Sequence, residues 1–304
     1  MLSADMERYV ELKRAAGFKF NDQASLLKNF VAFTAGYGDT FVRAHRVLDW
    51  AASAPSPQQR HIRLLAVRRF ALVMRAEDDR HEVPAADGLG SGHFERRPPH
   101  IYTPDEIVRL INAAAMMKPA GSIRPLMYAT LFGLLASTGL RISEALALRI
   151  EDVTEDGLII RETKFRKSRL VPLHDTTKEV LAVYVSVRTR LGTVSSSLFV
   201  STSGKAPAYS TIVTFFLRLA RSIGIRGEPG QQGPRIHDLR HTFAVRSLEQ
   251  CRHDREQVAR HIVALSTYLG HTHVRDTYWY LQATPLLLEQ IAEAGEALYR
   301  GDAT

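Results

Sequence analysis

Cationic side chains and tyrosines gather near the C-terminal end of the 304-residue chain, from Pro234 to Tyr280. His237 and Arg240 stand three residues apart, so a helix would place them on the same face. Like charges on one face cost stability unless an anion lies between them, which favours an anion site. The phenol of Tyr280 can act as a nucleophile when cations stabilise its anion. This set suits attack on a phosphodiester, whose oxygens must be neutralised.

Two further groups of charged residues precede this stretch. Arg141 and Glu144 follow Ser-Thr-Gly at 137–139 and, on a helix, would form an ordinary surface ion pair if taken alone. Residues 163–169 read Thr-Lys-Phe-Arg-Lys-Ser-Arg and place four cations at the tip of a predicted β-hairpin. Such a tip is commonly a charged, exposed turn, but it can also reach into a DNA groove.

A metal site is the competing interpretation of the histidines. His237 and His241 are four residues apart, as zinc ligands on a helix are. The residues between them are Asp-Leu-Arg, without the Glu that metalloproteases place beside the first His, and the cationic Arg240 opposes a dication. Cys251 is the one cysteine, so neither a disulfide framework nor a cysteine metal cluster is available within the chain. We expect no metal and no cofactor.

The composition indicates a globular protein with a polyanionic partner. Hydrophobic residues make up 45% and charged residues 24%, enough for real cores, and the length suggests two domains. The formal charge of +8 favours nucleic acid as the partner. The N-terminus does not resemble a signal peptide, and the longest apolar stretch, 126–135, is too short to span a bilayer. We expect a bacterial cytoplasmic, nucleoid-associated protein that does not bind membranes.

Four helices are predicted in the first 78 residues. The second is expected to begin at a cap formed by Asn21, the third at Thr40, and the fourth at Ser56 with proline in its first turn. The fourth carries arginines that either face solvent or follow phosphates, at 60, 63, 68, 69 and 75. Glycine and proline at short intervals predict a linker over 79–102.

The rest of the chain is predicted to be helical with a small sheet. A capping box at Thr103–Glu106 starts its first helix. Period-two patterning over 157–173 indicates a hairpin, and a short strand is expected at 198–201. The remaining predicted helices cover 122–138, 141–148, 176–191, 209–223, 238–250, 254–269 and 284–298.

Together, the order and spacing of these residues closely resemble the tyrosine recombinase (phage integrase) family. The matching motifs are Arg141-Ile-Ser-Glu144, Lys164 on the hairpin, His237-Asp-Leu-Arg240, Leu269-Gly-His271, and Tyr280 nine residues later. The resemblance is strong over 103–280 and weaker over 1–78. It implies a two-domain DNA clamp, mainly α with a small β-sheet. A helical core-binding domain would occupy 1–78, and an α+β catalytic domain with a C-terminal oligomerisation helix would occupy 103–304.

The resemblance also implies a role for each matched residue. Arg141 and Arg240 would hold the scissile phosphate, since guanidinium forks match its oxygens and stay charged. His237 and His271 would hydrogen-bond the same phosphate or move protons. Glu144 would orient the arginine and histidine without touching DNA.

The nucleophile implied by the resemblance is Tyr280, which would hold the cut DNA as a 3′-phosphotyrosine. Tyr278 competes on chemistry alone. Two positions on a helix differ by about 200° around the axis, so the two phenols would face different sides. On an extended segment they would share a side. The family spacing from His271 selects Tyr280.

Lys164 would protonate the leaving 5′-oxygen. Family members often place glycine directly after this lysine, because glycine permits a tight turn. Here Phe165 follows. A different turn is therefore expected, and Lys167 remains a second candidate for the general acid.

The resemblance further implies double-stranded DNA as the substrate and a homotetramer acting on two DNA sites through a Holliday junction. Accessory recombinases or directionality factors are possible partners. Integration, resolution of dimers and movement of a mobile element such as a transposon are not separated by the motifs. The alternatives are a type IB topoisomerase and a DNA-binding regulator without catalysis, although all the reactive residues are present.

Overall fold

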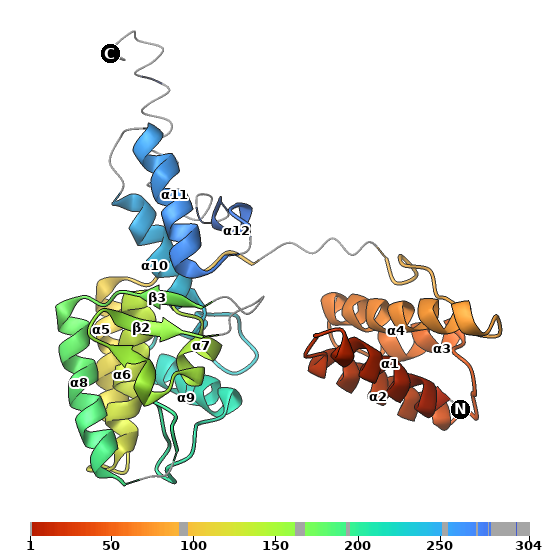
Figure 1. Ribbon diagram of the computed structural model, residues 1–304, viewed down its shortest axis with the longest axis horizontal. Helices are drawn as coiled ribbons and strands as arrows, with labels where there is room; N and C mark the ends of the chain where they lie inside the picture. Colours follow the sequence, from red (N-terminus) through yellow and green to blue (C-terminus); the bar gives the residue numbers. More distant parts are fainter. Residues whose placement is uncertain are drawn as a thin grey trace. The chain divides into compact units, whose positions relative to one another are not determined.

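The computed structural model describes residues 2–90, 97–161, 168–192, 195–250, 255–271, 273–278, 280 and 296 (Figure 1). Contacts divide the chain into two compact units, Met1–Arg97 and Pro98–Thr304. The described residues are mostly helical and include a three-stranded sheet, which confirms the predicted fold class at this level. Every helix in the described part of the chain is too short or too polar to span a membrane.

The first unit is a small bundle of helices around one core. The helices are α1 (Leu2–Ala15), α2 (Asn21–Ala35), α3 (Ala44–Ala52) and α4 (Pro57–Glu77). Phe30 and Phe70 are fully buried, as their helical spacing with other apolar residues predicts. The hydroxyl of Ser56 accepts a hydrogen bond from the backbone N of Gln59 at 3.2 Å, which confirms the predicted cap of α4.

Two other predicted caps are wrong. Asn21 is the first residue of α2, and Phe20 precedes it in the left-handed region with φ 49°. The third helix begins at Ala44 rather than after Thr40. Its start is capped from a distance, because a Glu82 carboxylate oxygen accepts the backbone N–H of Ala44 at 2.8 Å. A cap supplied 38 residues later leaves no local sequence signal.

Part of the expected linker is folded onto the first unit. His81 is buried and accepts a hydrogen bond on Nδ1 from the backbone N of Val42 at 3.2 Å. Val83 and Leu89 pack against the core of the unit. Residues 91–96 lie outside the described part.

The arginines of α4 fall into two groups. Arg60, Arg63 and Arg68 donate to backbone carbonyls of the same unit. Arg69 and Arg75 are exposed. The second pair is therefore accessible to an external anion, whereas the first group braces the bundle.

The second unit surrounds a larger core. Its elements are α5 (Pro104–Ala115), α6 (Ile123–Thr138), α7 (Ile142–Ala147), the 3-10 turn η1 (Ile150–Asp152), β1 (Val153–Thr154), β2 (Gly157–Ile160), β3 (Arg169–Val171), α8 (Asp175–Arg190), α9 (Tyr209–Ser222), α10 (Asp238–Glu249), α11 (Arg255–Leu269) and α12 (Arg275–Tyr278). The buried helix α6 lies against α5 and α8 on one part of its surface and against α10 on another (Figure 1). The capping box of Thr103 and Glu106 is present as predicted.

The sheet is antiparallel in the order β1-β2-β3, with Leu158 opposite Val171. The predicted hairpin is therefore confirmed in its strands, although its tip, 162–167, lies outside the described residues. The prediction of a strand at 198–201 is wrong. The apolar run is buried in the core, and the chain there makes one isolated bridge, Arg149 with Ser197. The predicted helix 284–298 lies outside the described residues except for Glu296.

Candidate active site

Arg240 lies in the first turn of α10 and has 2% relative exposure. Its NH1 atom donates to the carbonyl of Gly139 at 2.8 Å, and NH2 donates to the carbonyl of Leu269 at 2.7 Å. Burial, and then the charge of Arg141, lower the pKa of Arg240 to about 10, so the guanidinium still carries its charge at neutral pH. Its partners in the described chain are carbonyls, a histidine and the phenol of Tyr280 rather than a carboxylate.

Gly139 makes this arrangement possible. It ends α6 with φ 61°, in the left-handed region that glycine adopts readily. A Cβ atom at this position would lie 2.5 Å from the ring of Phe243. The turn therefore requires glycine. It directs the carbonyl of Gly139 at Arg240, and the chain then continues to Arg141.

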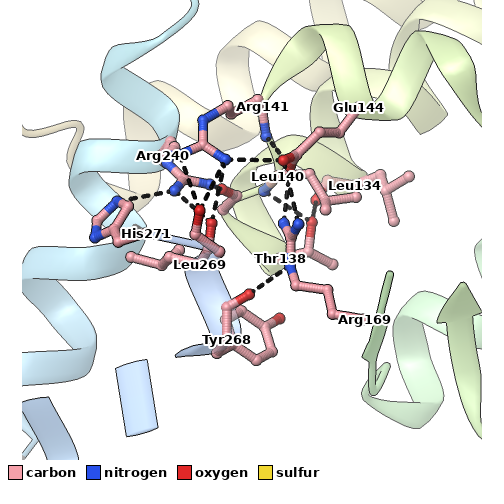
Figure 2. A network of polar contacts seen from close by, with 12 residues as sticks. Leu134, Thr138, Leu140, Arg141, Glu144, Arg169, Arg240, Tyr268, Leu269 and His271 are labelled. Carbon is pink, nitrogen blue, oxygen red and sulfur yellow. Dashed lines mark hydrogen bonds and ion pairs between the residues drawn. The ribbon is translucent and has the colours of Figure 1, made fainter. Parts of the chain in front are cut away.

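Arg141 precedes α7 rather than lying within a helix as predicted, because α7 begins at Ile142. Its NH1 atom donates to Oε1 of Glu144 at 2.8 Å, and its backbone N donates to Oε2 of the same carboxylate at 3.1 Å. The guanidinium also reaches the carbonyl of Leu269 at 3.4 Å (Figure 2). Arg141 and Arg240 thus share one carbonyl oxygen as an acceptor.

The carboxylate of Glu144 is bound by a second arginine that the sequence pattern assigned to the hairpin tip. Arg169 is instead the first residue of β3, and its side chain is 13% exposed. Burial alone would raise the pKa of Glu144, but Arg169 and Arg141 reverse this effect and hold it below its usual range. The sequence held one signal: Arg169 is two positions before the buried Val171, so both point to the same face of the strand.

His271 follows α11 after Gly270, whose φ of 67° ends the helix. Its Nε2 atom lies 3.0 Å from NH2 of Arg240. Burial, and then the charge of Arg240, lower the pKa of His271 to about 4. The imidazole is therefore neutral at neutral pH and is positioned against the guanidinium.

His237 is the residue immediately before α10, and its side chain is exposed. Partial burial, and then Arg240, lower its pKa. Its ring packs edge-on against His241, with centroids 4.8 Å apart. In the described residues, no three His, Cys, Asp or Glu side chains are grouped to hold a metal.

Tyr280 is 3% exposed and belongs to the small core formed by α10 and α11. Its ring centroid lies 5.4 Å from that of His241 and 5.9 Å from that of His271. The phenol also interacts with Arg240, and this interaction partly offsets the lowering of the pKa of that guanidinium. The structure therefore brings Tyr280 to Arg240 and to the two histidines. The side chain of Tyr278 lies outside the described part of the chain.

Arg141, Glu144, His237, Arg240, His271 and Tyr280 thus come together from four segments of the chain. Lys164, Phe165 and Lys167 lie outside the described residues. Sequence reasoning missed Arg169 as a site residue, and it also missed Thr277, whose buried hydroxyl meets His271.

Comparisons with known proteins agree on one family. Residues 101–286 match the model described as the phage integrase family. The chain is 38% identical over 295 residues to a putative integrase/recombinase, y4rB, of Sinorhizobium fredii (strain NBRC 101917 / NGR234), and the match covers 94% of each protein.

Solved structures share the fold. The structure of the Tn1549 transposon integrase in complex with transposon right end DNA aligns with a TM-score of 0.64 at 16% identity, over 95% of this chain and 99% of that one. A lambda integrase tetramer bound to a Holliday junction aligns with a TM-score of 0.61 at 17% identity, over 90% and 77%.

Proposed function

This chain belongs to the phage integrase family, whose members break and rejoin DNA, and from that premise we propose that it is a site-specific DNA recombinase. The proposed reaction cuts and rejoins strands through a 3′-phosphotyrosine and a Holliday junction. It acts on double-stranded DNA.

One observation supports this proposal most strongly. The guanidinium groups of Arg141 and Arg240 both donate to the carbonyl of Leu269, so two like charges are held close together in a partly buried place. Glu144 offsets only one of the positive charges of Arg141, Arg169 and Arg240, so the cluster is costly unless a further anion joins it. A phosphodiester fits, because each fork can donate two hydrogen bonds to its oxygens.

In the proposed mechanism, the oxygen of Tyr280 attacks the phosphorus and gives its proton to a neutral histidine of the site, while the bond from phosphorus to the 5′-oxygen breaks. Arg141 and Arg240 neutralise the charge that builds on the non-bridging oxygens. His237 hydrogen-bonds the same phosphate, and His271, whose neutral ring accepts on Nε2, is the proposed acceptor of the Tyr280 proton. The phosphotyrosine conserves the bond energy, so attack by a 5′-hydroxyl of the partner strand rejoins the DNA without ATP or metal.

Lys164 is proposed to protonate the leaving 5′-oxygen, with Lys167 as its competitor. A phosphorothiolate substrate replaces that oxygen with sulfur, which needs little protonation to leave. This substrate should restore cleavage by Lys164→Ala. Restoration of Lys167→Ala instead would reassign the acid.

We further propose that the first unit is a core-binding domain that closes on DNA with the catalytic domain, with Arg69 and Arg75 as phosphate contacts. A homotetramer joining two DNA sites, as in the lambda integrase complex, is the proposed active assembly. A mobile genetic element is the proposed source of the substrate; the DNA in the Tn1549 integrase complex is a transposon end. The proposed setting is cytoplasmic and nucleoid-associated.

The test is strand exchange between two plasmids that carry the crossover sequence mapped from genomic junctions flanking the gene. A recombinase yields joined plasmids in the presence of EDTA. A type IB topoisomerase would relax supercoiled plasmids without joining them. A regulator without catalysis would bind the sequence and leave both plasmids unchanged.

A further inference from the structure

Arg169 connects two parts of the site that are far apart in the sequence. Its NH2 and NH1 atoms donate to the two carboxylate oxygens of Glu144, at 2.8 and 3.2 Å. Its Nε atom donates to the carbonyl of Tyr268 at 2.8 Å (Figure 2). One guanidinium, only 13% exposed, therefore holds Glu144 and also the turn that precedes His271.

The turn is built to receive this guanidinium. A Cβ atom added to Gly270 would lie 2.8 Å from NH1 of Arg169. The next two carbonyls, of Leu269 and Gly270, face Arg141. Arg169 thus fixes the backbone whose carbonyls aim Arg141.

Charge gives Arg169 a second effect. Glu144 is 9% exposed and lies between Arg141 and Arg169. Without Arg169, its single negative charge would be matched by Arg141 alone, leaving that pair neutral. With Arg169 present, the three side chains keep one net positive charge, so Arg141 remains attractive to an anion while Glu144 still orients it.

We propose that Arg169 is a positioning residue that occupies Glu144 and thereby keeps the charge and direction of Arg141 available to the scissile phosphate. This inference rests on the proposed function, because the phosphate is that of the DNA strand to be cut. Arg169 itself does not touch the reacting atoms.

The experiment compares Arg169→Gln with the double variant Arg169→Gln/Glu144→Gln. Removing the positive charge should lower the rate of covalent adduct formation on a nicked suicide substrate by about 10- to 100-fold. Removing the carboxylate as well restores the net charge, so the double variant should cleave faster than Arg169→Gln. A residue that only held the fold would give no such recovery.

A matched control lies just after the neighbouring strand β2. Arg161 follows β2, is half-exposed and pairs with Asp152 and Glu151. Arg161→Gln removes the same charge from the unit and should retain the wild-type rate of cleavage. A loss equal to that of Arg169→Gln would show a general charge effect and would overturn the proposal.

A second measurement needs no DNA. Inorganic phosphate is titrated into the free protein at low ionic strength and followed by NMR of the arginine Nε–H groups. Affinity should fall in Arg169→Gln and recover in the double variant. If the variants bind phosphate in this pattern but wild type never cleaves DNA, the proposed function fails, while the effect of Arg169 on anion binding by Arg141 stands.

A double variant that binds phosphate no better and cleaves no faster than Arg169→Gln would overturn the inference. If Arg169→Gln does not fold, Arg169→Lys is measured in its place. It keeps the charge, so phosphate affinity should remain within about threefold of wild type. A larger loss would contradict the proposal.

Discussion

The buried hydroxyl of Thr277 lies 2.7 Å from Nδ1 of His271, while Nε2 of the same ring lies 3.0 Å from NH2 of Arg240. A guanidinium only donates, so Nε2 is the acceptor and the ring proton is on Nδ1, which donates to the Thr277 oxygen. Thr277 and Arg240 together set the tautomer of His271. A phosphate that takes over the Arg240 donor would free Nε2.

Replacing Thr277 by Val should remove the acceptor for Nδ1–H while keeping the side-chain shape. We expect a mixture of His271 tautomers and adduct formation slower by about 10-fold, because one hydrogen bond to a positioned ring is lost. Thr277→Ser should retain both the single His271 tautomer and the wild-type rate of adduct formation. Nitrogen-15 NMR of the imidazole reads the tautomer, and an unchanged spectrum in Thr277→Val would contradict this assignment.

Stability should fall as the pH drops below neutral. The pKa of His271 is lowered to about 4 and that of His241 to about 3 in the folded chain, mainly by burial. Below the unfolded value near 6.5, the unfolded chain binds protons that the folded chain does not, so acid favours unfolding. The stabilisation is therefore complete above about pH 7 and is lost progressively as the pH falls toward the folded values.

Thermal unfolding between pH 8 and pH 5 measures this effect. His271→Asn should show a smaller fall in Tm over this range than wild type. The exposed His273→Asn should show the full fall. Equal slopes in all three proteins would contradict the proposed linkage.

Gly139→Ala should both destabilise the second unit and impair cleavage. The left-handed conformation costs an alanine roughly 1–2 kcal/mol, and the added Cβ would lie 2.5 Å from the Phe243 ring. Gly133→Ala is the matched control within α6, where the nearest side-chain atom to a new Cβ is 3.7 Å away. It should stabilise by about 0.5–1 kcal/mol. Urea unfolding measures the stability of both variants. An unchanged free energy of unfolding in Gly139→Ala would contradict the requirement for glycine at this turn.

The residues proposed to carry the chemistry could be named from the sequence because they lie in short motifs of fixed spacing. The strong helices were predictable for a similar reason: α4 and α5 carry their caps beside them. The partners that lie far apart in the sequence could not be predicted in this way. Glu82 caps a helix 38 residues earlier, and Arg169 meets Glu144 across 25 residues. Such pairings follow from tertiary packing, which periodicity along one segment does not report.

The affinity for duplex DNA should fall steeply as the salt concentration rises. Arginine and lysine side chains release counterions from the DNA phosphates when the protein binds, and added salt opposes this release. Arg69→Gln and Arg75→Gln should each reduce the log–log slope by about one, since both side chains are exposed. Arg68→Gln should instead lower stability, because Arg68 donates to the carbonyl of Pro84 at 2.6 Å. A slope unchanged by both exposed substitutions would remove α4 from the DNA interface.

Tyr280 is proposed to be the nucleophile that attacks a phosphate held by Arg141 and Arg240. Tyr280→Phe should abolish the covalent protein–DNA adduct on a suicide substrate and leave DNA affinity nearly unchanged, because one hydroxyl is lost. Tyr278→Phe, the matched control, should still form adduct. The most direct measurement is mass spectrometry of the DNA-linked peptide from the trapped wild-type adduct. Attachment at Tyr280 is the predicted result, and attachment at Tyr278 or at a serine would contradict the mechanism.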